Sequence, residues 1–507
     1  MKSSYLSEMQ SRRQFIRQAA CAAVGTGAMS NVLRDMRFIN SALAQTGIND
    51  YKALVCVFLN GGNDSNNLII PTNTAEWANY AAIRSNVLAI PNTDNSNPAA
   101  TALALTSKNG QTGYPKDDLH TYGFHPAMPE LASLFNTGKV ATLFNVGTLS
   151  YPMTKAQYQS GSVPAPPQLF SHSDQQTQWQ TSIPDQPPVS GWGGRMSDLL
   201  TTPVNVNTGG QISMAVTLAG SNIFEVGNVN AAPQYAVTTG GAVSLSGFGN
   251  AARKSAFTSI LTNDKASLDL QTNAYANILD HAVNEASIVT TALAANASAT
   301  YLSHFPGSVT TPNGGSTFNS SLMSQMKMVA RLIDAGKNSL GMSRQIFFIQ
   351  VGGYDTHTLQ TANADNASPS DASVIIGQQA NLLAELSQTL NALYQAMKDL
   401  GLANNVTAFT VSDFARTFPC NGSGSDHGWG GHHLVVGGAV KGQATYGTFP
   451  TLTVNGPDDT GTGRWIPTTS VDQYAATLAS WFGVDQGNLR TIFPNIGRFA
   501  STNIGFI

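Results

Sequence analysis

The stretch that decides the fold is "ALVCVFLNGGND", residues 53–64. Seven consecutive apolar residues, Ala53 to Leu59, have the length of a β-strand. An apolar side chain at every position is typical of a strand that is buried on both faces of a parallel sheet. Asn60, two glycines, Asn63 and then Asp64 follow directly. The stretch therefore predicts a buried strand that is followed closely by a carboxylate.

The same pattern recurs along the chain. Residues 345–351 predict a second buried strand, with Asp355 and His357 behind it, and residues 406–411 predict a third, with Asp413 behind it. Two further strands are predicted at 140–146 and 434–436. Helical patterns separate the strands, at residues 74–90, 125–135, 171–180, 191–200, 253–298, 319–336, 374–400 and 470–483. Strands that alternate with helices predict a layered α/β fold with a mainly parallel sheet flanked by helices.

Two segments do not fit this alternation. Residues 91–123 are polar and irregular, and residues 210–250 alternate apolar and polar residues among many glycines, which favours a meander of short strands. We expect one domain, residues 45–507, with insertions near 91–123 and 203–250.

The first 44 residues predict an export signal. The sequence around Arg12-Arg13, "SRRQFI", precedes a weakly apolar run and a small-x-small cleavage site at Ala42-Leu43-Ala44. This order is typical of a twin-arginine signal peptide, and the alternative is an amphipathic first helix. The signal implies the twin-arginine translocase as a partner and a periplasmic or secreted mature protein.

Charge and hydropathy exclude two classes of partner. Removal of residues 1–44 takes away six of the 26 basic and two of the 29 acidic residues, which leaves 20 and 27 and a net charge of −7. A nucleic-acid binder needs a basic surface, so we expect none here. No later stretch approaches the roughly 20 apolar residues that a membrane span requires. Cys56 and Cys420 remain in the mature chain, and a bridge between them is one alternative.

The side chains that follow the strands suggest a metal site. In open α/β sheets, ligands bind outside the carboxyl ends of the strands, where Asp64, Asp355 and Asp413 are expected. His357 should point to the same side as Asp355, because side chains two apart in an extended segment do so. Carboxylate and imidazole ligands suit a divalent cation such as Zn²⁺, Mg²⁺, Mn²⁺ or Ca²⁺. The alternatives are a turn residue for Asp64 and a helix cap for Asp413.

Residues 423–442, "SGSDHGWGGHHLVVGGAVKG", concentrate more ligand types. Asp426, His427, His432 and His433 lie within eight positions of a chain that has nine histidines in all. This loop leads into a strand instead of following one, and one of the two adjacent histidines is expected only to pack.

Ser171 is the candidate nucleophile. It begins the helical segment in "SHSD", where it could bind an anion beside the exposed N–H groups of the helix or simply cap them. A cation on its oxygen would lower the pKa of the hydroxyl. Ser173 is an alternative two residues further on.

Taken together, these motifs resemble a known family. The segments "VFLNGGNDSNNLIIP", "LFSHSDQQTQW", "GWGGRMSDLL", "FFIQVGGYDTHTLQ", "TVSDFART" and "SDHGWGG" resemble the exported bacterial proteins of domain of unknown function 1501 (DUF1501) over nearly all of the mature chain. That family is similar to a divergent branch of the alkaline phosphatase and sulfatase superfamily. The resemblance implies an alkaline-phosphatase-like α/β core, one or two divalent metals and a Ser, Thr or formylglycine nucleophile.

The resemblance also implies site residues. It places the nucleophile at Ser171. It places metal ligands at Asp64, Asp355, His357, Asp413 and His427, with Asp426 and His432 in assisting positions. Arg195, in "GWGGRM", is either an oxyanion clamp or a surface arginine. Phe414 stands where the superfamily has a histidine ligand, His357 follows Asp355 more closely than in the phosphatases, and no sulfatase signature surrounds Ser171.

Three functions follow from these patterns. The first is an exported, metal-dependent hydrolase of phosphate or sulfate esters. The second is a non-catalytic exported protein that retains the fold and acts in binding or secretion, which Phe414 favours. The third, a redox enzyme that is loaded with its cofactor before export, lacks a dinucleotide fingerprint, a haem motif or paired cysteines.

Overall fold

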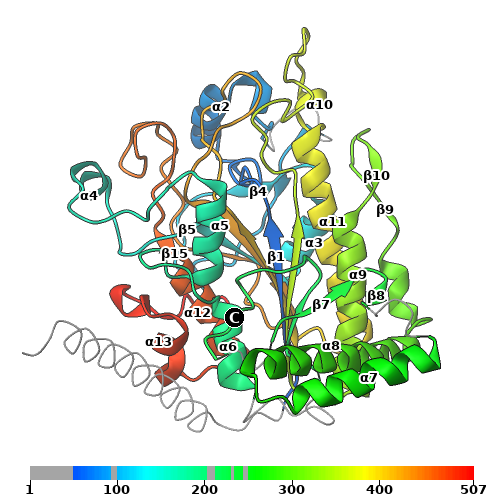
Figure 1. Ribbon diagram of the computed structural model, residues 1–507. Coiled ribbons are helices and arrows are strands. Elements are labelled where there is room, and N and C mark those ends of the chain that lie inside the picture. The colour runs from blue at the N-terminus through cyan, green and yellow to red at the C-terminus, as the bar shows by residue number, and fades with distance from the viewer. Residues whose placement is uncertain (1–49, 93–99, 202–211, 230–232, 244–248) are drawn as a thin grey trace, which may run out of the picture.

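The computed structural model describes residues 50–92, 100–201, 212–229, 233–243 and 249–507. The predicted signal segment lies outside these residues. Within them, the prediction of an α/β fold with a mainly parallel sheet is confirmed: a central sheet lies between two groups of helices (Figure 1).

The main sheet has ten strands in the order β14-β5-β13-β12-β1-β11-β6-β7-β8, with β15 paired to β5. Its strands are β1 (Lys52–Leu59), β5 (Val140–Gly147), β6 (Ala215–Thr217), β7 (Tyr235–Thr238), β8 (Gly241–Ala242), β11 (Arg344–Val351), β12 (Val406–Ser412), β13 (Gly431–Gly437), β14 (Ala444–Tyr446) and β15 (Thr469–Ser470). Two small sheets lie outside it, formed by β2 (Ile69–Pro71), β3 (Leu103–Ala104) and β4 (Tyr122–Phe124), and by β9 (Ser308–Thr310) and β10 (Thr317–Asn319).

Helices cover both faces of the main sheet. On one face pack α3 (Pro129–Asn136), α9 (Ser321–Asp334) and α11 (Gln378–Asp399). On the other pack α5 (His172–Thr181), α6 (Trp192–Leu200), α12 (Val471–Phe482) and α13 (Leu489–Ile492). The remaining α-helices are α2 (Thr74–Leu88), α4 (Lys155–Ser160), α7 (Ala251–Lys265), α8 (Leu270–Ala295) and α10 (Asp371–Val374).

Strand β1 explains why its sequence is apolar throughout. Successive side chains of a strand point to opposite faces, so Val55 and Val57 enter the core under α9 and α11, while Leu54 and Phe58 enter the core under α6 and α12. Both cores exclude water from β1, which pairs in parallel register with β11 on one side and β12 on the other. The loops that follow these three strands therefore leave the sheet at one edge.

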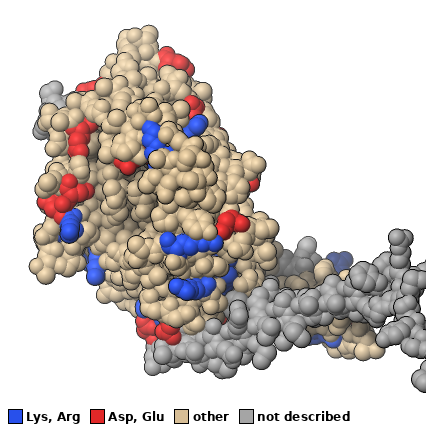
Figure 2. All heavy atoms as spheres, turned by 90° about the vertical axis from the view of Figure 1, so that its left-hand side faces the viewer, with Lys and Arg blue, Asp and Glu red and all other residues tan. Residues whose placement is uncertain are grey.

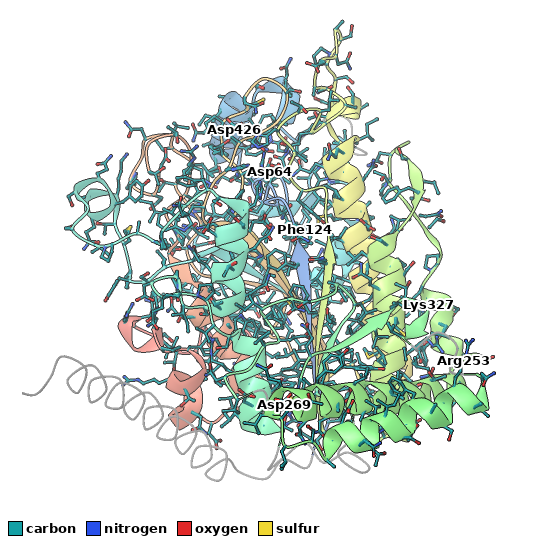
Figure 3. The ribbon with its side chains drawn as sticks, viewed as in Figure 1. Asp64, Phe124, Arg253, Asp269, Lys327 and Asp426 are labelled. Atoms are coloured by element: carbon teal, nitrogen blue, oxygen red, sulfur yellow. The ribbon has the colours of Figure 1, made fainter. Side chains whose placement is uncertain are left out.

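Strand β13 runs against this direction. It is antiparallel to both of its neighbours, β12 and β5. It therefore begins at the edge where β1, β11 and β12 end, which is why the loop around His427 precedes a strand. Figure 3 shows Asp64 and Asp426 at this end of the molecule, whereas Asp269 and Arg253 lie at the opposite end.

Three predicted elements differ from the structure. The helical pattern at 253–298 is two helices, α7 and α8, because Asp269 accepts the backbone N–H groups of Gln271 and Thr272 and starts a new helix there. The pattern at 374–400 is interrupted at Gly377, whose φ of 114° no helix contains. The described part of the segment 210–250 forms the predicted short strands, but only β7 and β8 pair antiparallel as in a meander, whereas β6 and β7 extend the main sheet in parallel.

The surface carries few charges. On the face drawn in Figure 2, Lys and Arg form small groups that are separated by uncharged residues and by Asp and Glu. None of the described helices combines the length and the apolar character that crossing a membrane would need.

Candidate metal and active site

The loop after β1 passes through a space that only glycine fits. Gly61 and Gly62 have φ angles of 115° and 83°, in the region that side chains disfavour. A Cβ on Gly61 would lie 2.3 Å from the backbone nitrogen of Asp355, and one on Gly62 would lie 2.5 Å from the ring of Phe414. The two glycines thus allow the loops that follow β1, β11 and β12 to touch at the sheet edge.

Three histidines and one aspartate meet at this edge. Asp355 Oδ1 lies 3.1 Å from His357 Nε2 and 3.4 Å from His427 Nε2. Asp355 Oδ2 lies 3.5 Å from His172 Nε2. Single ligand atoms of His172, Asp355 and His427 all lie within 4.8 Å of one another, and His357 Nε2 is 2.9 Å from His427 Nε2. The structure therefore brings Asp355, His357 and His427 together, as the sequence pattern predicts, and adds His172.

The other ring nitrogen of each histidine is fixed by an oxygen. His172 Nδ1 lies 2.6 Å from Asp413 Oδ2, and His357 Nδ1 lies 3.1 Å from Asp426 Oδ1. His427 Nδ1 lies 2.7 Å from the carbonyl oxygen of Phe170, which can only accept. Nδ1 therefore donates in each ring, and in the neutral tautomer the lone pair lies on Nε2. Ligating histidines in metal proteins are oriented in this way by a carboxylate or a carbonyl group.

The arrangement fits a divalent cation. The Nε2 lone pairs of His357 and His427, 2.9 Å apart, repel unless a proton or a cation is shared between them. Two buried atoms at the site, His172 Nε2 and Asp413 Oδ1, have no hydrogen-bond partner among the described residues. A bound cation would satisfy the first of these directly, and His172, Asp355 and His427 could hold it, with His357 Nε2 beside them.

The surroundings shift the pKa values of two histidines of the cluster in opposite directions. The hydrogen bond to Asp413 raises the pKa of His172, whereas burial lowers the pKa of His427. Burial alone would raise the pKa of Asp355, but Arg416, 2.6 Å away, and the neighbouring histidines lower it overall. Asp355 is thus held as a carboxylate, the form that binds a cation.

Asp413 and Asp426 lie behind the histidines. The Asp413 side chain is fully buried, and its Oδ2 also accepts from the Gln176 amide at 3.0 Å and from the Gly61 backbone at 3.2 Å. Asp426 accepts from Asn421 at 2.9 Å. Each carboxylate contacts the Nδ1 atom of a ring and not the Nε2 atoms of the cluster, so Asp413 orients His172 and Asp426 orients His357.

Asp64 turns away from the cluster. Its buried carboxylate forms an ion pair with Arg84, whose side chain is also fully buried, and accepts from the Gln360 amide at 2.5 Å. The Asn66 backbone donates to its other oxygen at 3.2 Å. Asp64 lies at the expected sheet edge, but its carboxylate pairs with Arg84 and does not join the group of His172, Asp355 and His427.

Two other candidates lie in the interior. His432 is buried between Phe144 and Phe449, and its Nδ1 accepts the backbone N–H of Asn145 at 3.2 Å. Arg195 is 1% exposed, so the surface alternative is wrong. Its guanidinium donates to the carbonyl groups of Ile492, Ser190 and Thr181 at 2.6–2.8 Å, and these bonds direct it to the core and not to the histidine cluster.

Ser171 stands next to the cluster in the chain. It occupies the position before α5 but makes no side-chain cap. Its hydroxyl donates instead to Asp174 Oδ2 at 2.6 Å, and the Ser173 hydroxyl lies 3.4 Å away. Phe170 on one side of Ser171 binds His427, and His172 on the other side binds Asp413, so both neighbours of Ser171 are fixed to the site.

Sequence reasoning missed His172 and Arg416. His172 lies between two serines in "SHSD", which points to a nucleophile and not to a ligand. The signal that could have found it is the small number of histidines, nine in the whole chain, which makes each one a candidate ligand. Arg416 follows Asp413 by three residues, and its side chain is fully buried while it pairs with Asp355. A buried arginine needs such a partner, but the sequence does not say which carboxylate supplies it.

Phe414 also belongs to this site. Its ring centroid lies 4.8 Å from that of His172 and 4.7 Å from that of His427, and the residue is 2% exposed. An aromatic ring offers no ligand atom to a cation, so Phe414 closes one side of the cluster with an apolar wall.

The chain belongs to the family described as "Protein of unknown function (DUF1501)", which matches residues 51–489. No curated protein matches it. Among solved structures, the chain is similar to Ps i-CgsB in complex with k-i-k-neocarrahexaose, at 9% identity and a TM-score of 0.33 over 87% of this chain and 74% of that chain. A second structure of Ps i-CgsB is similar at 9% identity and a TM-score of 0.32 over 89% and 77%.

Burial of His432 predicts a pH-dependent stability. Burial lowers its folded-state pKa to about 3, below the unfolded value of about 6.5. Between these values the unfolded chain binds a proton that the folded chain does not, so the unfolding free energy should fall as the pH falls. His432→Gln retains an acceptor for the Asn145 amide and should reduce this slope by about 1.4 kcal/mol per pH unit between about pH 5.5 and pH 4. Urea unfolding at several pH values measures this slope. An equal slope in His432→Gln and the unchanged protein contradicts the low folded-state pKa of His432.

Proposed function

We propose that the protein is an exported, metal-dependent hydrolase of phosphate or sulfate esters. The observation that carries this proposal is the convergence of three histidine Nε2 atoms on Asp355, with each ring fixed through Nδ1 by an oxygen acceptor. Metal sites that serve hydrolysis need this combination of aligned ligands and access for a substrate. The side chain of Asp355 is 45% exposed and that of His357 40% exposed, which provides the access.

The donor set favours a borderline cation. Imidazole nitrogen suits Zn²⁺ and its transition-metal neighbours, whereas Mg²⁺ and Ca²⁺ prefer mostly oxygen ligands. Three imidazoles with one carboxylate therefore favour Zn²⁺ over Mg²⁺ or Ca²⁺. Such a cation supplies Lewis-acid polarisation of an ester oxygen. The pairing of Asp64 with Arg84 supports a single cation at this edge.

The residues around Ser171 support its role as the nucleophile. Its oxygen is not used as a helix cap, and its proton is already directed to Asp174 at 2.6 Å. When the Ser171 oxygen bonds to the phosphorus or sulfur of an ester, Asp174 can take that proton. The alcohol of the ester then leaves, and water releases the anion from the serine in a second step.

Retention of metal tests the site directly. We expect the mature protein to retain about one divalent cation per chain after exposure to Zn²⁺ and dialysis, and His172→Ala to lose it, because the variant removes one of the four ligands. His304→Ala is the matched control, since His304 also pairs with an aspartate, Asp399, at 2.8 Å, on the surface. Elemental analysis measures the metal. Equal retention in the two variants would contradict the site.

Turnover tests the chemistry. We expect hydrolysis of an aryl phosphate or an aryl sulfate by the metal-loaded protein, and a loss of at least about 10³-fold in kcat for Ser171→Ala. Ser173→Ala should stay within about two-fold, because Ser173 lies 3.4 Å from Asp174 and is exposed. Loss of activity in Ser173→Ala alone would assign the nucleophile to Ser173. Metal binding without turnover of either ester would favour a non-catalytic exported protein instead.

Export is the remaining part of the proposal, and the twin-arginine motif supports it. The double variant Arg12→Lys, Arg13→Lys should keep the full-length chain in the cytoplasm, because the translocase recognises the arginine pair. Cell fractionation and the size of the chain on a gel report this. A processed, exported double variant would mean that these arginines do not direct export.

A further inference from the structure

The loop that carries Arg464 is built around one buried carboxylate. Asp459 is fully buried and accepts four backbone N–H groups, from Asn455 at 2.6 Å, Gly461 at 3.0 Å, Gly463 at 2.8 Å and Arg464 itself at 2.8 Å. A carboxylate with this many donors fixes the backbone of the turn. The position of Arg464 is therefore set before any ligand binds.

The guanidinium of Arg464 lies beside the histidine cluster. Its Cζ is 4.3 Å from the ring centroid of Phe170, and its Nε donates to the carbonyl oxygen of His427 at 2.8 Å. Phe170 in turn accepts from His427 Nδ1 and precedes Ser171 in the chain. Arg464 thus contacts both the segment that carries a metal-binding histidine and the segment that carries the candidate nucleophile.

Arg498 has the same arrangement with one addition. Its Cζ lies 4.3 Å from the ring centroid of Tyr151, and it donates to the carbonyl oxygen of Ser150 at 3.1 Å. It also forms an ion pair with Asp185 at 2.7 Å. Arg498 therefore has a ring, a carbonyl group and a carboxylate as neighbours, whereas Arg464 has only the first two among the described residues.

The contrast extends to the other arginines of the site. Arg84 and Arg416 pair with Asp64 and Asp355, whereas Arg464 forms no ion pair among the described residues. With its Nε on His427 and one face on Phe170, the two Nη groups of Arg464 make no hydrogen bond to a described residue. A planar fork of this kind matches two oxygens of a phosphate or a sulfate group.

We propose that Arg464 binds the anionic group of the ester substrate through its Nη groups and is the main substrate-binding side chain of the site. This inference rests on the proposed hydrolase function and deepens it, because it names the residue that selects phosphate and sulfate esters over neutral ones. It assigns to Arg464 the role that the sequence pattern suggested for Arg195.

Anion binding tests the inference without requiring turnover. Calorimetric titration of the zinc-loaded mature protein with inorganic phosphate, and separately with inorganic sulfate, at fixed ionic strength should show binding that Arg464→Gln weakens at least about ten-fold. Arg464→Lys should recover part of the affinity, since it keeps the charge but not the fork. Arg498→Gln is the matched control and should bind as the unchanged protein does. Zinc content and melting temperature confirm that each variant is loaded and folded.

Each result has a defined meaning. Equal phosphate and sulfate affinity in Arg464→Gln and the unchanged protein overturns the inference, and so does the absence of binding at millimolar anion in the unchanged protein. Arg464-dependent binding without hydrolysis of aryl esters supports the inference and contradicts the hydrolase proposal. If turnover is present, Arg464→Gln should raise KM at least about ten-fold for anionic aryl esters, whereas an unchanged KM overturns the inference. If Arg464→Gln loses zinc or unfolds, Arg464→Lys takes its place in the test. An anion affinity of Arg464→Lys equal to that of the unchanged protein then overturns the inference that the planar guanidinium binds the anion.

Discussion

The site depends on one constraint, which is that each of three imidazole rings is held by an oxygen at Nδ1. Asp413, Asp426 and the Phe170 carbonyl group leave the rings no freedom to turn a hydrogen toward Asp355 in the neutral state. Two of the nitrogen lone pairs therefore face each other at 2.9 Å, and the three ring nitrogens lie 3.1–3.5 Å from the Asp355 carboxylate. Such an arrangement is repulsive by itself, and its natural complement is a positive charge at the centre.

The fold supplies this constraint through the direction of its strands. Asp355 and Asp413 follow parallel strands that end at one edge, and β13 brings His427 to the same edge because it runs the other way. His172 arrives from outside the sheet, on the helix that packs against it. Four distant segments thus contribute one or two groups each, so that the site exists only when the main sheet is complete.

Much of this could be predicted from the sequence. Apolar runs located β1, β11 and β12, and the polar residues behind them located the edge, because strand direction and side-chain alternation are local properties. The side chain with which each polar residue pairs, however, is set by residues that are distant in the sequence. Asp64 has the same setting in the sequence as Asp355, yet it pairs with Arg84, which lies on α2. His432 and His427 are five residues apart, yet only one lies before the strand begins, while the other is inside it and packs against aromatic rings.

Two buried arginines balance carboxylates at the sheet edge. The carboxylates of Asp64 and Asp355 lie at the same edge and need compensating charge. Arg84 provides this charge for Asp64, and Arg416 shares Asp355 with the histidines. Phe414 then needs no ligand atom, and its ring can fill the space beside His172 and His427. The two buried arginines and the phenylalanine therefore leave one group of possible ligand atoms at this edge among the described residues, that of His172, Asp355 and His427.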